Sequence, residues 1–330
     1  MSFKIEKIPF GEFEVIKIIS LNGGDILTVC NYGATVTSYQ YLQNGKITDI
    51  LLPYHSPAEL KQGEAAVNWI MAPYSNRMRD GLYTFNNQVY RLDDHSGKSH
   101  GLVKKQVFNL EEITQNQSEV IIKFSTEITS GMYAAYPFHI AVSVTYLFRQ
   151  AALDITIEGS NRSRANVPFG CGWHPYFYFK ENGINALKLF IPSDEVIKVD
   201  ENLVPLHNNF IEKLSSDDTM YFADAANPEE LSFKSLNACF TNLKYNESGH
   251  ITAKLTDTVH KTSFSIYQQR GVFYAYIPEN LRGEYRKAIA LEPVEFMTDA
   301  FNRPELRDDI LLAPGQKRSF NFGIIRESLH

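Results

Sequence analysis

The chain of 330 residues is long enough to bury a large hydrophobic core, in one large β domain or in two domains of ordinary size. It carries 32 Lys and Arg against 38 Asp and Glu, a net charge of -6, and the acidic residues are spread along the sequence. Such a surface repels polyanions, which excludes nucleic acids and anionic membranes as expected partners.

The N-terminal segment alternates apolar and charged residues and lacks the continuous apolar core of a secretory signal. No apolar run reaches the roughly eighteen residues that a membrane helix requires. The cysteines Cys30, Cys171 and Cys239 are widely separated and form no C-x-x-C pair, which argues against a disulfide framework or a zinc site. We therefore expect a soluble protein of the reducing cytoplasm.

Short alternations of apolar and polar residues, rich in β-branched and aromatic side chains, predict strands along the chain. The clearest are residues 120–124, 139–148, 153–158, 187–191, 263–268 and 272–277. Clusters of Asn, Gly and Ser, which are typical of turns, separate them. An aromatic content of 13% also favours sheet over helix.

Helical signals are short, and the best are residues 57–62 and 228–231, where a proline opens an acidic first turn. Neither is long enough to cover a sheet, so a doubly wound α/β fold and a (β/α)₈ barrel are disfavoured. No linker or repeat divides the chain. The sequence predicts an all-β protein, one large antiparallel β-sandwich domain over residues 1–330 with few short helices.

Three segments place polar groups in surroundings that are too apolar, or too rich in Gly and Pro, for ordinary surface. They are residues 72–80 with 99–101, residues 168–177, and residues 288–302. The polar side chains in them are candidates for a binding or catalytic site.

His174 lies between Trp173 and Pro175, and the proline biases the backbone of His174 to an extended conformation. Gly170 and Gly172 allow another backbone or a ligand to approach closely. Two interpretations are open: a core histidine whose ring is satisfied by a backbone carbonyl, or an imidazole that takes part in chemistry.

Glu292 follows four apolar residues and precedes Pro293, so it is expected at the end of a strand and partly buried. A buried carboxylate either forms an ion pair with an arginine or acts as a general base. Glu295 lies three residues further on, which in a strand is the opposite face. The two carboxylates are therefore poor candidates for the acid and base of a glycosidase.

Arg77 lies beside Asn76 and follows a mainly apolar stretch of sequence. Its guanidinium could hold two hydroxyls or a ring oxygen through two donors. Its neighbour Arg79 is expected to be a solvated loop charge. His100 by itself is typical of a loop histidine. A metal site made by His100, His174 and Glu292 has no local ligand spacing to support it.

Together these segments resemble the galactose mutarotase, or aldose 1-epimerase, family. The matching motifs in chain order are Asn31 to Val36, Asn76-Arg77, His100-Gly101, Tyr136-Pro137-Phe138, Trp173 to Phe177, Leu291-Glu292-Pro293 and Asp299 to Asn302. Each motif alone is weak, but their common order over residues 31–302 is specific. One departure is Ser99, where the family has a leucine before the histidine.

The resemblance implies a galactose mutarotase-like supersandwich that interconverts the anomers of a hexose, such as galactose or glucose, without a metal or organic cofactor. By position, His174 would be the general acid, Glu292 the general base, and His100 and Arg77 the groups that hold the sugar and its ring oxygen. The expected catalytic residues are Glu292, His174 and His100, and the expected substrate-binding residues are Arg77, Asn76, Asn237, Tyr176 and Trp173.

The physiological sugar stays open at this point. Many relatives carry an aspartate at the position of Asn237, and an amide there loses a charge-assisted hydrogen bond to a sugar hydroxyl. One alternative is a hexose-phosphate mutarotase, suggested by a group of basic residues: Arg77, Arg79, Lys98, Lys104 and Lys105. Another is a carbohydrate-binding protein that lacks the reaction. A monomer or a homodimer is expected.

Overall fold

The computed structural model describes residues 2–92, 99–231 and 234–329. Strands make up nearly all of the regular structure in these ranges, and α1 (Pro57–Gln62) is the one α-helix found there. None of the described segments forms a helix long and apolar enough to cross a membrane. The prediction of a mainly β fold is therefore confirmed.

The two helix predictions have different outcomes. At α1, the hydroxyl of Ser56 caps the first turn and Gly63 ends the helix with a left-handed φ of 61°, so local signals at both ends agree. The helix predicted at residues 228–231 is wrong, because Glu229–Glu230 forms strand β19 against β16 (Leu187–Phe190). Hydrogen bonds to a neighbouring strand here override the local propensity of a short segment.

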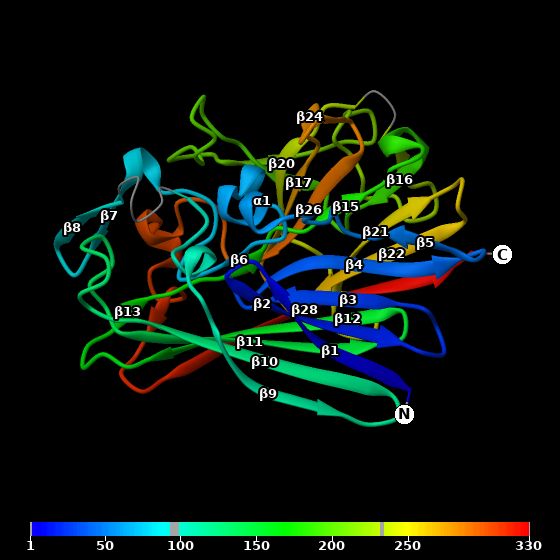
Figure 1. The fold of residues 1–330 in the computed structure, drawn as a ribbon. Coiled ribbons are helices and arrows are strands. Elements are labelled where there is room, and N and C mark those ends of the chain that lie inside the picture. Colours follow the sequence, from blue (N-terminus) through cyan, green and yellow to red (C-terminus); the bar gives the residue numbers. More distant parts are fainter. Residues whose placement is uncertain (1, 93–98, 232–233, 330) are drawn as a thin grey trace.

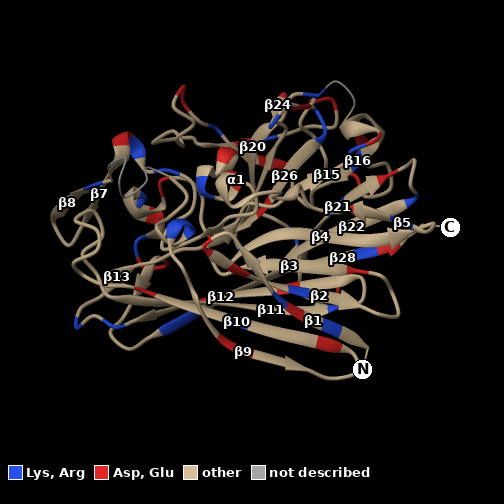
Figure 2. Cartoon of the chain, viewed as in Figure 1, with Lys and Arg blue, Asp and Glu red and all other residues tan. Residues whose placement is uncertain are grey.

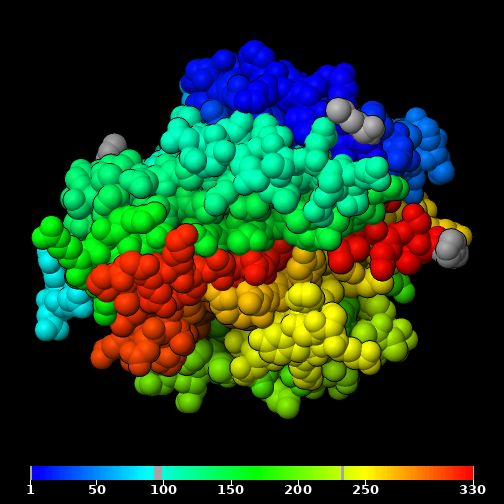
Figure 3. All heavy atoms as spheres, turned by 90° about the horizontal axis from the view of Figure 1, so that it is seen from below, coloured from blue at the N-terminus to red at the C-terminus, as the bar shows by residue number. Residues whose placement is uncertain are grey.

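The largest sheet has nine antiparallel strands in the described chain, in the order β19-β16-β21-β22-β28-β12-β11-β10-β9. Its remaining strands are β9 (Asn109–Gln115), β10 (Glu119–Ile128), β11 (Ile140–Arg149), β12 (Ala152–Asn161), β21 (Ile251–Asp257), β22 (Thr262–Gln268) and β28 (Lys317–Ser328). Figure 3 shows the C-terminal strand β28, in red, lying between the green strands and the yellow ones. Burial alternates along β10 and β11, which is the pattern that predicted them.

Two smaller sheets pack on this large one (Figure 1). The first has the order β1 (Phe3–Phe10), β2 (Phe13–Ser20), β3 (Ile26–Cys30), β4 (Thr35–Gln43) and β5 (Lys46–Asp49). The second has the order β18 (Ile211–Lys213), β17 (Glu195–Ile197), β20 (Asn237–Thr241), β23 (Val272–Tyr276), β26 (Ala288–Val294), β14 (Gly172–Trp173) and β6 (Ile70–Met71), with β15 (Tyr176–Tyr178) also paired to β26. Short two-stranded pairs are β7 (Leu82–Phe85) with β8 (Gln88–Arg91), β13 (Val167–Pro168) with β27 (Leu311–Leu312), and β24 (Asn280–Leu281) with β25 (Glu284–Tyr285).

Aromatic contacts show that both smaller sheets cover the same face of the large one. Phe148 in β11 contacts the rings of Phe3 in β1 and Tyr39 in β4, each with a centroid distance of 6.1 Å. Phe322 in β28 stacks on Trp173 in β14 at 5.8 Å. The strand register places Phe148 and Phe322 on one face. The hydrophobic core of the sandwich lies between these layers. Figure 2 shows that acidic and basic residues are interspersed over the chain.

Candidate functional site

Three adjacent strands of the eight-stranded sheet form the floor of a cavity. In the register, Tyr274 of β23 lies opposite Glu292 of β26, and Tyr276 lies opposite Asn237 of β20. Residues at alternate positions of a strand share a face, so these four side chains point the same way. They line a cavity of about 430 Å³, in the size range of small-molecule sites. The small Ala290, opposite Tyr276, leaves room beside them.

Segments from distant parts of the sequence, most of them outside strands, complete the wall of this cavity, which we call the catalytic cavity. They contribute Gly63, Ala65, Ala66, Trp69, Asn76, Arg77, Ser99, His100, His174, Tyr176 and Leu203. The structure thus brings together every predicted site residue except Trp173.

His174 and Glu292 contact each other within the catalytic cavity. The imidazole Nε2 lies 3.4 Å from the carboxylate Oε1, and the two residues are 6% and 4% exposed. The backbone of His174 is fixed on both sides, because its N–H donates to the carbonyl of Trp69 (3.0 Å) and its carbonyl accepts from the N–H of Asn68 (2.9 Å). Its ring stacks on Tyr176 with a centroid distance of 5.1 Å. The acid and base candidates are therefore neighbours in a fixed arrangement.

The contacts do not fit a purely structural role for either residue, which would be a core histidine bonded to a backbone carbonyl or a glutamate paired with an arginine. Nδ1 of His174 is buried without a hydrogen-bond partner in the described residues, so no backbone carbonyl satisfies the ring. Glu292 makes no ion pair with an arginine in the described chain, although the positive charge of Arg77 acts on it. Each group keeps hydrogen-bonding capacity for a ligand.

Burial opposes the charged forms of Glu292, His174 and His100. It raises the pKa of Glu292 well above the usual range of a glutamate, an effect that the charge of Arg77 partly offsets. It lowers the pKa of His174 to about 3, and it lowers the pKa of His100 well below the ordinary histidine value, with the charge of a protonated His174 as a further cause. Burial therefore opposes the charged form of both members of the pair and favours a protonated Glu292 beside a neutral His174.

We expect Glu292→Gln to stabilise the fold at alkaline pH. Because the pKa of Glu292 is raised by burial in the folded state, the stability of the native protein falls as pH rises above the ordinary value of 4.5 and through the raised folded value. The glutamine variant does not titrate in this way. Thermal unfolding at pH 8 should give a higher Tm for the variant, and at pH 4 the two proteins should unfold together. A lower Tm of the variant at pH 8 would contradict this electrostatic description.

The motif Asn76-Arg77 is paired with the segment that carries His100. The backbone N–H of His100 donates to the carbonyl of Asn76 at 2.6 Å. Gly101 follows with a φ of 72°, and a Cβ there would lie 2.3 Å from the carbonyl oxygen of Ala72, so this close approach requires glycine. The two short motifs that are 24 positions apart in the sequence thus form one wall.

Trp173 does not line the catalytic cavity, and its prediction as a sugar-binding residue is wrong. It is 0% exposed, its indole N–H donates to the carbonyl of Asn68 (3.1 Å), and its ring stacks on Phe322. Neighbouring residues of an extended chain point in opposite directions, so a cavity-facing His174 turns Trp173 into the core. Trp69 is the tryptophan that lines the cavity, with its ring 6.5 Å from that of His100.

Sequence reasoning also missed Tyr274, Tyr276 and Leu203, whose places depend on long-range pairing. Glu295 lies away from the catalytic cavity, as expected, and it is paired with Arg270 at 2.5 Å. In the described ranges, no group of three or more His, Cys, Asp or Glu side chains is arranged to hold a metal ion.

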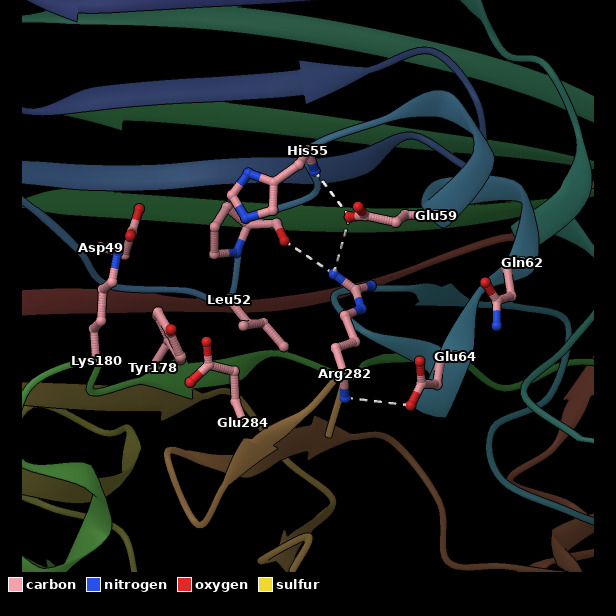
Figure 4. A pocket seen from close by; sticks show the side chains of 11 residues that line it. Asp49, Leu52, His55, Glu59, Gln62, Glu64, Tyr178, Lys180, Arg282 and Glu284 are labelled. Carbon is pink, nitrogen blue, oxygen red and sulfur yellow. Dashed lines mark hydrogen bonds and ion pairs between the residues drawn. The ribbon is translucent and has the colours of Figure 1, made fainter. Parts of the chain in front are cut away.

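Arg282 contacts the segments that flank α1 on both sides, as Figure 4 shows. Its Nη1 donates to the carbonyl of Pro53 (2.9 Å), and its backbone N–H donates to the carboxylate of Glu64 (3.3 Å). Its guanidinium lies 4.2 Å from the ring centroid of Tyr54, whose hydroxyl donates to the carbonyl of Val67 (2.6 Å). Pro53, Glu64 and Arg282 line a second cavity of about 320 Å³. Together these contacts hold the segment between the two cavities in place.

Comparisons with known proteins identify the family and the fold of the chain. Residues 17–324 match the family described as aldose 1-epimerase. The chain is 25% identical over 312 residues to YihR, an uncharacterised protein of Escherichia coli strain K12. The match covers 93% of this chain and 92% of that protein. It is 22% identical over 337 residues to the aldose 1-epimerase of the same strain, with 94% of both chains covered.

Solved structures show the same fold. A galactose mutarotase-like protein of Clostridium acetobutylicum superposes with a TM-score of 0.81 and 16% identity, over 99% of this chain and 98% of that chain. Galactose 1-epimerase of Lactobacillus acidophilus gives 0.79 and 16%, over 99% of each chain. The fold is that of the galactose mutarotases, and the matched span of 17–324 shows that the chain belongs to the aldose 1-epimerase family.

Proposed function

We propose that the protein is an aldose 1-epimerase that interconverts the α and β anomers of a hexose by opening and closing its ring. The observation that carries the proposal is the contact of 3.4 Å between His174 and Glu292 in a cavity that Arg77 and His100 also line. The exchanging hydroxyl oxygen and the ring oxygen of a pyranose are both bonded to C1. Groups that serve both oxygens must therefore be neighbours, as these two are.

In ring opening, the carboxylate of Glu292 takes the proton of the C1 hydroxyl while the imidazolium of His174 gives its proton to the ring oxygen. The bond between C1 and the ring oxygen breaks, and the C1 hydroxyl becomes a carbonyl. The protein is then left with a protonated carboxyl and a neutral imidazole, which is the state that burial favours. After rotation about C1–C2, the same two groups run the proton transfers in reverse and close the ring on the other face.

Around this pair, the cavity offers both hydrogen bonds and apolar contact. Arg77 favours the ionised form of Glu292 that begins the reaction, because its charge lowers the pKa of that carboxyl. His100 is kept neutral by burial, and because its Nδ1 contacts the sulfur of Met71 (3.1 Å), its Nε2 is the ring nitrogen that would bond a sugar hydroxyl. Asn237 adds a neutral amide, and Trp69 offers an aromatic edge for the C–H groups of the ring.

The test is polarimetry of freshly dissolved α-galactose and α-glucose with added protein. We expect the approach to the anomeric equilibrium to accelerate in proportion to protein concentration, with the final rotation unchanged. Heat-denatured protein at the same concentration is the control. No acceleration with either sugar would overturn the assignment and would leave a carbohydrate-binding protein on this fold.

A phosphorylated hexose has less support. Arg77 is the one residue of the basic group that lines the catalytic cavity among its described members, and Lys98 lies outside the described residues. Lys104 is 6% exposed, with its Nζ bonded to the carbonyl of Ser99 and lying 5.0 Å from the ring centroid of Trp69. Competition with glucose 6-phosphate in the same assay decides between the substrates, and we expect the free sugar to be preferred.

A further inference from the structure

A leucine stands at the mouth of the catalytic cavity, on the loop that joins β17 to β18. Leu203 lines the cavity, and it is 39% exposed, whereas Glu292 on the floor is 4% exposed. A large apolar side chain in contact with both solvent and the cavity would lose water contact when a ligand fills the space beside it.

The backbone of this loop holds Leu203 in an unfavourable conformation. Its φ is 59°, in the left-handed region that a leucine avoids. The turn is closed around Asp200, whose carbonyl accepts from the N–H of Leu203 (2.9 Å) and whose side chain accepts from the N–H of Val204 (3.1 Å). Residues held in such conformations are frequent at ligand sites, where the surrounding contacts maintain them.

The loop is tied to the segment that carries Arg77. Arg79 pairs with the carboxylate of Asp200 (2.7 Å) and donates to the carbonyl of Pro205 (2.9 Å), so its prediction as a solvated loop charge is wrong. The backbone N–H of Arg79 donates to Asp299 (2.8 Å), and Asp299 in turn donates from its backbone N–H to the carbonyl of Arg77 (2.9 Å). One network therefore sets the position of the Leu203 loop relative to a side chain of the cavity wall.

We propose that Leu203 is a substrate-binding residue that packs on the C–H surface of the bound hexose at the mouth of the catalytic cavity. This inference rests on the proposed function. Leucine has no hydrogen-bonding group, so it acts by excluding water and by favouring C–H groups of the substrate over hydroxyls at that point. Its contribution should be the same in the bound ground state and in the transition state, because no bond of the sugar changes there.

The test is a pair of variants, Leu203→Gly and Leu203→Asn. Both residues tolerate a positive φ, so the loop should keep its conformation and the Tm should not fall. For galactose and glucose, we expect KM to rise about tenfold in both variants while kcat stays within about twofold of the native value. Leu21→Gly removes a leucine that is 57% exposed and lies away from the cavity, and it should leave both constants unchanged.

The outcomes separate this inference from the function itself. If the native protein does not accelerate anomer exchange, the proposed function fails and the Leu203 variants are not needed to show it. If the native protein is active and both variants keep its KM, Leu203 does not contact the sugar and this inference alone is overturned. A fall in kcat at unchanged KM would also overturn it, because the residue would then act on the chemical step.

Discussion

Glu292→Gln is expected to lower kcat for anomer exchange on the order of 10³-fold, the largest effect of any single substitution in this chain. An amide cannot take the proton of the C1 hydroxyl, and the rest of the cavity is unable to replace it, because Glu292 is the one carboxylate among the described residues that line it. NMR of the anomeric protons at equilibrium, which measures exchange in both directions, gives the rate.

The glutamine variant keeps nearly the same shape, so folding is not the cause of the loss. Glu292→Asp provides a second check, because it keeps the carboxylate but withdraws it from the 3.4 Å contact with His174, and it should retain part of the activity. Full activity in Glu292→Gln would mean that another group is the base.

The second largest effect is expected for His174→Asn, a loss of kcat of on the order of 10²-fold to 10³-fold. The asparagine amide occupies part of the space of the ring, but it cannot deliver a proton to the ring oxygen. Stopped-flow polarimetry of α-galactose measures the loss. The matched control is His260→Asn, because His260 lies outside the catalytic cavity, where it pairs with Asp257 at 2.7 Å. Equal losses in the two variants would show that the effect is not specific to His174.

The strands of the large sheet were the most predictable part of the fold. Their alternating residues meet one apolar layer, so a local pattern of period two carries the information, as in β10 and β11. The six predicted strands are all present, and only their ends differ. The failed helix at residues 228–231 shows the limit, because its conformation depends on pairing with β16, a strand about forty positions earlier in the chain.

The site was predictable where ordered motifs mark it and unpredictable where pairing creates it. His174 and Glu292 were found because polar residues within apolar strands are unusual. Trp173 was wrongly predicted to bind the sugar because a sequence motif consists of consecutive residues. In an extended chain, every second side chain of such a motif points away from the site. Tyr274 and Tyr276 lie in an ordinary aromatic strand, and only the register with Glu292 and Asn237 reveals their role in the floor.

In the proposed mechanism, His174 and Glu292 act as one unit on a single hemiacetal. The most direct measurement is the anomer-exchange rate of the double variant Glu292→Gln/His174→Asn beside the two single variants. Because each proton transfer needs the other, the double variant should be about as slow as the slower single variant. If the two losses multiply, the groups act independently, and the account given for this pair is wrong.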